Sequence, residues 1–232
     1  MRSIIIKTPQ RMENKLSFFF KHQIWHLGGT AVLFYLSTQI VNFQNNTNTF
    51  IGIDANTWFI FSMSIPLAHQ AYVWVCWRSE LCWKIISDSI GFKGYTIGFF
   101  ILFLSRLSSI GLCIVDYGSL FKPGLLAWIV SLIIFIPAIY TFYSVKKYFG
   151  LKRATGADHF DSRYKEMPFE KGGIFQWSSN AMYVFGMAIF FGFAIATGSK
   201  AGLIFAIYSY TSIWLHYFCT EREDFKIIYQ NS

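Results

Sequence analysis

Residues 201–229 read AGLIFAIYSYTSIWLHYFCTEREDFKIIY, a run of fifteen mostly apolar residues followed by a compact group of charged side chains. Five of the six residues from Glu221 to Lys226 carry charge. The apolar run predicts a buried or lipid-facing helix, and the ionic group marks where that helix leaves the apolar environment. The groups that these charges face depend on how the rest of the chain is arranged.

The composition of the chain is typical of an integral membrane protein. Of its 232 residues, 54% are hydrophobic and 14% charged, and the mean hydropathy is +0.39. Soluble domains carry about 25% charged residues. The formal charge of +8 fits basic loops that face anionic lipid, so no nucleic acid partner is expected. The four cysteines form no CxxC pair, which argues against a disulfide framework or a metal site.

Apolar runs near the ~20 residues that a helix needs to cross hydrocarbon recur along the chain. They predict an all-α, polytopic transmembrane bundle of about six spans, at 24–42, 57–77, 95–115, 124–144, 181–198 and 201–218. We divide the chain into N-terminal transmembrane helices, residues 1–144, and a C-terminal region, residues 145–232, that comprises a loop, a final hairpin and a tail.

The distribution of Lys and Arg supports this arrangement. Seventeen of them fall in segments on the side of the N-terminus, and only Lys122 and Lys200 fall in loops on the other side. Such an excess marks the cytoplasmic side. We therefore expect a multi-pass protein of the inner membrane or endoplasmic reticulum with both termini in the cytoplasm.

The last two predicted spans are joined by only Gly198-Ser199-Lys200. A connection this short predicts an antiparallel helical hairpin. The loop 145–180 and the tail 219–232 then lie on the same side of the membrane, about two helix diameters apart at most. The charged tail is thus expected to face a loop rich in Gly, Asp, His, Arg and Lys, next to an apolar wall.

Several polar residues of the loop and tail have an ordinary structural explanation when taken singly. Asn180 follows two serines and precedes an apolar run, which is typical of a helix cap. His216 could be an interfacial aromatic residue, and the acidic residues after it a solvated helix end. Asp158 and His159 could form a local turn. Their convergence at one end of a hairpin favours a polar pocket for a water-soluble cofactor beside a lipid-like substrate.

Three segments together resemble a known family. GADHFDSRY (156–164), EKGGIFQWSSNAMYVFG (170–186) and GSKAGLIFAIYSYTSIWLHYFCTEREDFKIIY (198–229) look like the phospholipid methyltransferases. These belong to the integral-membrane methyltransferases, which include the isoprenylcysteine carboxyl methyltransferases. The resemblance covers about residues 145–230 and implies a methyltransferase with S-adenosylmethionine as cofactor, bound in a cytoplasmic pocket at the end of the final helical pair.

The resemblance also implies positions in the cofactor site. Asn180 and Tyr183 match an Asn-Pro-Met-Tyr stretch in which Ala181 here replaces Pro. Gly198 and Ser199 match the hairpin turn, and His216 the start of the terminal motif. The acidic position that contacts the cofactor aligns best with Glu221; Glu223 is the second candidate, since Arg222 separates glutamates that are adjacent in many relatives.

The chemistry of methyl transfer adds further candidates. An amine acceptor must lose its proton, and a carboxylate or imidazole near the headgroup can take it. Asp158, His159 and Glu166 are the catalytic candidates. Arg106 lies about twelve positions into a predicted span, where a charge is costly and usually faces a cavity or a partner. It is a candidate for binding the phosphate of the lipid, and the alternatives are a structural pair with an acid and a misplaced span boundary.

The sequence is compatible with more than one function. Methylation of a phospholipid amine is our leading hypothesis, with the bilayer and a lipid or lipid-linked acceptor as partners. Methylation of an isoprenylcysteine carboxylate or a small thiol fits the same scaffold. A sterol-reductase-like enzyme that uses NADPH also gathers polar residues at helix ends, but its tail is usually rich in Arg and His. A non-catalytic membrane scaffold is the third class.

Overall fold

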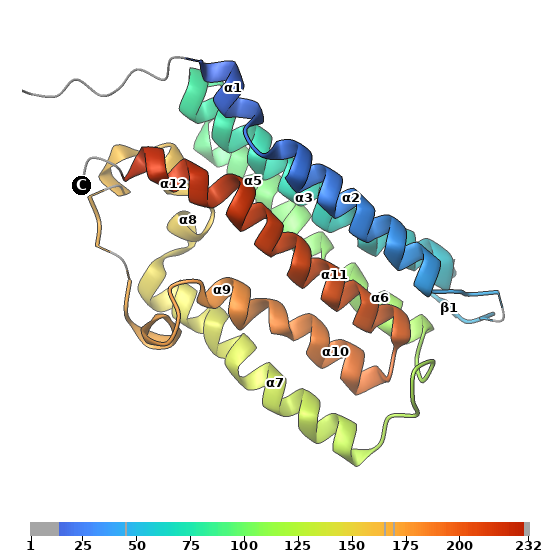
Figure 1. Cartoon of the computed structure of the whole chain (residues 1–232). Helices are drawn as coiled ribbons and strands as arrows, with labels where there is room; N and C mark the ends of the chain where they lie inside the picture. The colour runs from blue at the N-terminus through green and yellow to red at the C-terminus, as the bar shows by residue number, and fades with distance from the viewer. Residues whose placement is uncertain (1–13, 45, 165, 169, 230–232) are drawn as a thin grey trace, which may run out of the picture.

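The computed structural model describes residues 14–44, 46–164, 166–168 and 170–229 and forms one elongated bundle of helices (Figure 1). The α-helices are α1 (Lys15–Phe20), α2 (Gln23–Ile40), α3 (Ala55–Trp83), α4 (Ile85–Ser89), α5 (Gly91–Ser105), α6 (Ser108–Val115), α7 (Leu125–Ser144), α8 (Leu151–Ala154), α9 (Ala181–Val184), α10 (Ile189–Thr197), α11 (Lys200–His216) and α12 (Arg222–Ile228). Strands β1 (Thr49–Phe50) and β2 (Ile53–Asp54) form a small antiparallel hairpin.

Short helical turns of other types complete the element order. Two are π-helical, η1 (Val145–Phe149) and η6 (Tyr217–Glu221). Four are 3-10 turns, η2 (Ala157–His159), η3 (Ser162–Tyr164), η4 (Gly173–Gln176) and η5 (Gly186–Ala188). The basic residues among the first thirteen positions lie outside the described residues.

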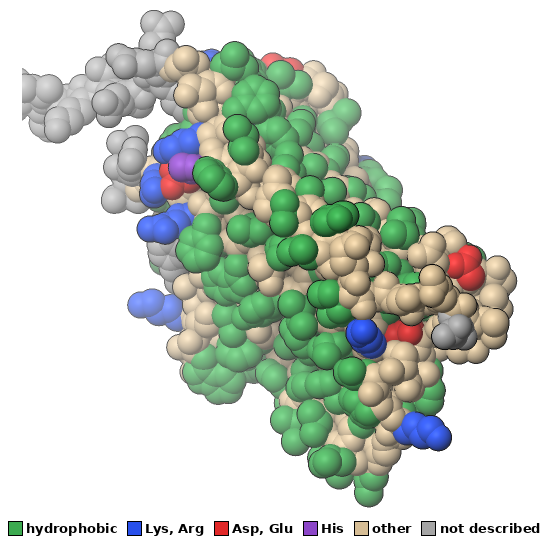
Figure 2. All heavy atoms as spheres, turned by 45° about the vertical axis from the view of Figure 1, so that its right-hand side comes forward, with side chains coloured by type: hydrophobic (Ala, Val, Ile, Leu, Met, Phe, Trp, Pro, Cys, Tyr) green, Lys and Arg blue, Asp and Glu red, His purple; other side chains and the backbone are tan. Residues whose placement is uncertain are grey.

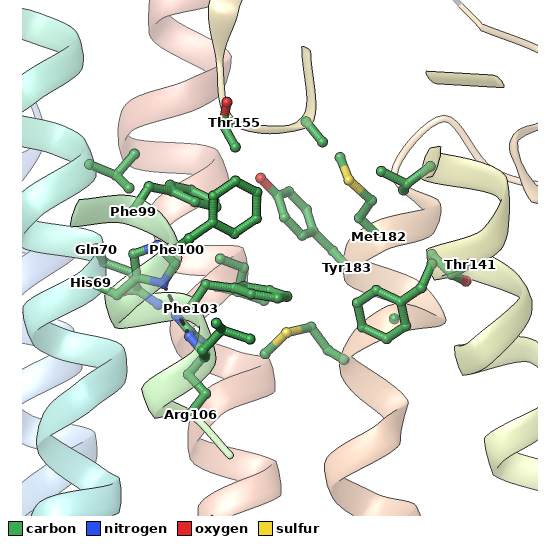
Figure 3. A pocket seen from close by; sticks show the side chains of 18 of the residues that line it. His69, Gln70, Phe99, Phe100, Phe103, Arg106, Thr141, Thr155, Met182 and Tyr183 are labelled. Carbon is green, nitrogen blue, oxygen red and sulfur yellow. Dashed lines mark hydrogen bonds between the residues drawn. The ribbon is translucent and has the colours of Figure 1, made fainter. Parts of the chain in front are cut away.

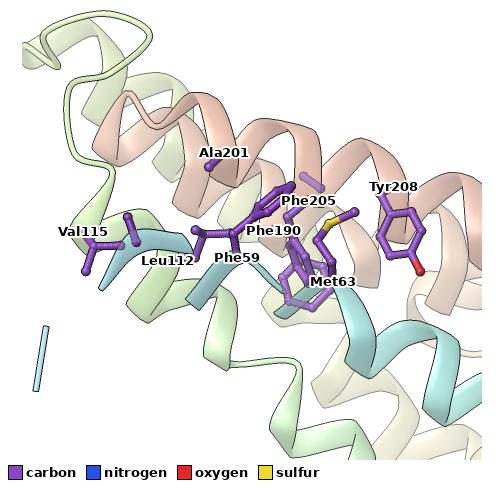
Figure 4. Packing of buried hydrophobic residues seen from close by; sticks show 10 residues of the cluster. Phe59, Met63, Leu112, Val115, Phe190, Ala201, Phe205 and Tyr208 are labelled. Carbon is purple, nitrogen blue, oxygen red and sulfur yellow. The ribbon is translucent and has the colours of Figure 1, made fainter. Parts of the chain in front are cut away.

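Helix α11 lies at the centre of the bundle. It packs against α2, α3 and α6 on one side and α10 on another, while α10 in turn packs on α7 (Figure 1). The main apolar core lies where these helices meet and includes Phe59, Met63, Leu112, Phe190 and Phe205 (Figure 4). The C-terminal hairpin is therefore built into the N-terminal helices rather than attached beside them.

Long apolar helices agree with an integral membrane protein. Three of the described helical stretches are long and apolar enough to cross a membrane: Ala55–Trp83, Gly91–Val115 and Leu125–Phe149. Ala181–Thr197 is a shorter apolar helix. Hydrophobic side chains dominate the face shown in Figure 2, and α7 exposes a series of them, including Leu125, Leu132, Ile136 and Ile139. Helices occur at each predicted span, whereas the number that cross the membrane stays a prediction.

The observed helices differ from the predicted spans in their ends or by internal breaks, and the span 181–198 is divided into α9, η5 and α10. Helix α3 continues past the predicted end at 77 because Arg78 and Glu80 are buried and hydrogen bonded. The predicted span 95–115 is interrupted at Arg106, between α5 and α6. The last helix continues through η6 into α12, so the charged stretch is itself helical and packs on the bundle.

The predicted helical hairpin is present. Gly198 joins α10 to α11 with a φ of +60°, and a Cβ there would lie 2.1 Å from the Phe121 carbonyl oxygen. Glycine is therefore required for both its backbone angles and its lack of a side chain. The loop 145–180, the start of α1 and the tail α12 lie at one end of the bundle, and this turn lies at the other (Figure 1).

Candidate functional site

The best candidate for a functional site is where α9 meets the π-turn η6. The Tyr183 hydroxyl donates a hydrogen bond to Glu221 Oε2, which joins the loop side of the hairpin to the tail. Burial raises the pKa of the half-buried Glu221 carboxyl to about 7, although the hydrogen bond from Tyr183 opposes the shift. π-turns often occur at functional sites because the wider turn redirects side chains. This carboxyl thus changes charge near neutral pH.

A cavity of about 240 Å³ lies beside this pair, between α3, α5, α7, α9 and α11 (Figure 3). Its walls are mostly apolar, with Phe99, Phe100 and Phe103 of α5 on one side and Met182 on another. A few polar residues interrupt the apolar lining, namely His69, Gln70, Arg106, Thr141, Thr155, Tyr183 and His216. An apolar cavity with a few polar groups is the usual form of a small-molecule or lipid site.

His216 lines the cavity from α11. Its ring centroid lies 5.0 Å from that of His26 and 5.8 Å from that of Trp77. Its Nδ1 is buried without a hydrogen-bond partner in the part of the chain that the structure describes. An unpartnered buried nitrogen is costly unless a ligand completes it.

Behind His216, buried polar side chains connect α2, α3 and α11. His26 contacts Gln23 Oε1 through Nδ1 at 2.9 Å and Gln70 Oε1 through Nε2 at 3.1 Å. Gln70 donates to Ser212, and Gln23 donates to Thr220 of the π-turn η6. The N-terminal helices therefore position the turn that carries Glu221.

Asp158 and His159 lie on the 3-10 turn η2, where they hold the tail in place. The Tyr229 hydroxyl donates to Asp158 Oδ2, and His159 Nε2 lies 3.4 Å from Asp224 Oδ2. The His159 ring stacks on Trp77 with centroids 4.1 Å apart. Trp77 lines the cavity, whereas Asp158 and His159 do not. The structure thus brings both residues to the tail and places them behind the cavity wall.

Asp224 forms the centre of the tail's attachment. It is fully buried, and Arg78 Nε donates to its Oδ1 at 3.0 Å. The Arg78 guanidinium also donates to main-chain carbonyls, those of Phe18, Phe19, Lys21 and Cys219. One buried arginine of α3 therefore joins the α1–α2 junction to the tail.

Glu223, the second candidate for cofactor contact, is engaged in ion pairs. Its carboxylate lies 2.6 Å from Lys21 Nζ and also accepts from Lys226. Burial works to raise its pKa, but the hydrogen bonds and charges of the two lysines outweigh burial and lower the pKa to about 2. Glu223 thus fastens α12 to the α1–α2 junction, and of these two glutamates it is Glu221 that lies beside the cavity.

Three other predicted site residues lie away from the cavity lining. Gly198 and Ser199 are at the opposite end of α11, a helix about 25 Å long. Ser199 caps that helix and donates to Asp116 Oδ2 at 2.8 Å. Glu166 is exposed on the loop, with no hydrogen bond or ion pair to any described residue. The structure does not bring these three together with Glu221.

The ordinary structural explanations do not account for Asn180 and Arg106. Asn180 precedes α9, but its side chain makes no capping hydrogen bond. Arg106 pairs with no acid among the described residues, and its Nε donates to His69 Nδ1 at 3.2 Å. The helical stretch containing Arg106 extends to Val115, so the arginine does not mark the end of a span.

Sequence reasoning missed His69, Trp77 and Arg78. His69 and Arg78 are polar or charged residues in or at the end of an apolar run, and that pattern by itself indicates a specific partner. Their partners lie 37 and 146 residues away in the sequence, which only folding reveals.

A pH dependence follows from the pKa of Glu221. Its folded-state pKa of about 7 lies above the ordinary glutamate value of 4.5, so ionisation opposes folding as pH rises. We expect the wild-type protein to lose about 1–3 kcal/mol of stability relative to Glu221→Gln between pH 5 and pH 8. Thermal unfolding of both proteins in detergent across this range measures the difference. Parallel pH profiles would contradict the assignment.

The fold and cavity define an integral membrane protein with a mostly apolar cavity next to a titratable carboxyl. Residues 126–232 match the family model described as phospholipid methyltransferase, which confirms the resemblance of the loop, hairpin and tail. This region of the chain is thus phospholipid methyltransferase-like. The match begins in α7, earlier than the predicted boundary at 145. Neither the curated proteins nor the solved structures compared with the chain give a match.

Proposed function

We propose that the protein is an S-adenosylmethionine-dependent methyltransferase that N-methylates the amine of a phospholipid. The observation that carries this proposal is the apolar cavity that ends against Tyr183 and His216 beside the Glu221 carboxyl. The family match over residues 126–232 supports the methyl-transfer chemistry. The cavity wall supports an acceptor with an apolar body.

The residues at η6 and α9 fit a cationic, amphiphilic cofactor. S-adenosylmethionine supplies an activated methyl group for in-line displacement. The Glu221 carboxylate, oriented by Tyr183, would hold a cationic or hydroxyl group of the cofactor, because hydrogen bonds to ionised groups are the strong ones. Asn180 has an amide with no hydrogen bond to a described residue, and the rings of Trp214 and Tyr217 lie beside Tyr183. This donor and acceptor set suits the ammonium, ribose and adenine groups.

The protein's contribution to catalysis is mainly positioning and proton removal. Holding the donor and the amine in near-attack geometry can lower the barrier by roughly 7–11 kcal/mol at best. His216 lines the cavity and has an unpartnered ring nitrogen, so it is better placed than Asp158, His159 or Glu166 to take the amine proton. Asp158 and His159 would act indirectly, by holding the tail that carries Glu221.

The proposal is tested with full-length protein in detergent or nanodiscs. We expect calorimetry to show binding of S-adenosylhomocysteine, and a labelled methyl group to appear in phosphatidylethanolamine. The same assay offers an isoprenylcysteine analogue and a small thiol as competing acceptors, and NADPH oxidation tests reductase activity. Folded protein that binds no S-adenosylhomocysteine at millimolar concentration would overturn the proposal. Label in the thiol or carboxyl acceptor alone would overturn the choice of substrate.

A further inference from the structure

The cavity contains a positive charge with no counter-charge among the described residues. Arg106 is 4% exposed and lies between α5 and α6, fifteen residues beyond Gly91 in an apolar helical stretch. It forms no ion pair within the described ranges. The carboxylates near the helix ends are engaged elsewhere: Asp116 with Ser199, and Asp224 with Arg78.

The cost of this arrangement indicates an anion-binding site. Charges inside a membrane protein are almost always paired or face a water-filled space, because an uncompensated buried charge is strongly unfavourable. The two histidines nearest to Arg106 in the cavity lining supply no negative charge. His69 and His216 lie in the same cavity lining, and the charge of Arg106 acts on His216.

The contact between Arg106 and His69 leaves donors available. Arg106 Nε donates to His69 Nδ1 at 3.2 Å, so the imidazole proton of neutral His69 resides on Nε2. His69 Nε2 and Arg106 Nη1 both lack hydrogen-bond partners in the described chain. Both residues line the cavity, and Figure 3 shows them on the same side, next to Phe103. Two unpartnered donors and a fixed positive charge match the oxygens of a phosphate or carboxylate.

We propose that Arg106 and His69 bind the phosphate group of the phospholipid acceptor. The inference rests on the proposed function and assigns the acceptor's place within the cavity. The phosphate would lie against α3 and α5, and the neighbouring amine would be directed to Tyr183 and His216. Phe99, Phe103 and Phe142 would contact the apolar part of the lipid. Arg106 and Tyr183 line the same cavity, so a phosphate on Arg106 would lie in the space that also reaches the cofactor side.

Lipid binding without methyl transfer tests this inference separately from the enzyme activity. We compare dihexanoyl-phosphatidylethanolamine, dihexanoylglycerol, phosphoethanolamine and inorganic phosphate as ligands of the wild type, Arg106→Gln and His69→Ala, using calorimetry in detergent. The expected result is that Arg106→Gln weakens the phospholipid at least tenfold and His69→Ala to a smaller degree. Dihexanoylglycerol should bind weakly and equally to all three. Arg163→Gln, at an exposed arginine, is the matched control.

The other outcomes are equally decisive. Equal phospholipid affinity in folded wild type and Arg106→Gln overturns the proposal. If Arg106→Gln weakens S-adenosylhomocysteine instead, the anion is the cofactor's carboxylate. If inorganic phosphate binds as tightly as the phospholipid, the site is for a small anion. Arginine-dependent lipid binding without methyl transfer would support the phosphate site and contradict the proposed function. His69→Ala provides the test if Arg106→Gln fails to fold.

Discussion

Replacing Arg78 by alanine is expected to destabilise the protein by about 3–5 kcal/mol, the cost of leaving a buried charge without its partner. Arg78 is fully buried and donates to Asp224 at 3.0 Å. It also donates at 2.7 Å to the Lys21 carbonyl and at 2.9 Å to the Cys219 carbonyl. The substitution therefore leaves a buried carboxylate and several buried main-chain carbonyls without their hydrogen-bond donor. Denaturant unfolding in detergent micelles measures the loss.

The control and the paired variants sharpen this prediction. Arg163→Ala removes an exposed arginine whose side chain is 88% accessible and which pairs with Asp161. It should cost less than about 1 kcal/mol. Arg78→Met combined with Asp224→Leu should recover only part of the loss, because the carbonyls that Arg78 satisfies remain without a donor. Full recovery in the double variant would show that the pair alone, and not the carbonyl contacts, accounts for the effect.

Glu221→Ala is expected to weaken the binding of S-adenosylhomocysteine tenfold to a hundredfold, about 1.4–2.8 kcal/mol. The reason is the loss of a charge-assisted hydrogen bond at a half-buried site. The measurement is best made at pH 8, since the Glu221 pKa of about 7 leaves the carboxyl largely ionised there. The affinity of the wild-type protein for S-adenosylmethionine should fall about tenfold between pH 8 and pH 6, because protonation removes the negative charge of Glu221.

Two variants separate a direct role of Glu221 from damage to the tail. Glu223→Ala removes the neighbouring carboxylate, which pairs with Lys21 and Lys226. It should lower stability and leave ligand affinity within about twofold once the protein is folded. Tyr183→Phe keeps the ring and removes the donor to Glu221, so an intermediate loss of affinity is expected. If Glu223→Ala weakens the ligand as much as Glu221→Ala, the acidic residue of the site has been misassigned.

The helices could be predicted because each depends on a continuous run of apolar residues in the sequence. Apolar runs such as 124–144 need an apolar environment wherever they lie, and α7 is observed at Leu125–Ser144. Their ends were less predictable. The predicted span ended at 77, before Arg78 and Glu80. Arg78 is buried because Asp224, 146 residues away, pairs with it, and Glu80 because it accepts from nearby Ser87, so α3 continues to Trp83.

The candidate site was predictable where a motif placed residues at fixed positions beside the same turn. Tyr183 and Glu221 were both named from the sequence, and the structure joins them by a hydrogen bond. Asp158 and His159 were named as catalytic residues, yet they contact the tail at Tyr229 and Asp224. Their residue types alone do not distinguish a group that faces a cavity from one that lies behind its wall.

By itself, the sequence determined that this is a helical membrane protein and that its C-terminal part is phospholipid methyltransferase-like, because composition and motif spacing are properties of the linear chain. The tertiary structure decided which charged groups are paired and which remain available. It uses Glu223 and Asp224 to fasten the tail, and it leaves Glu221 and Arg106 beside the cavity. The reason is that the energy of a buried charge depends on partners brought near by folding, and sequence separation does not reveal them.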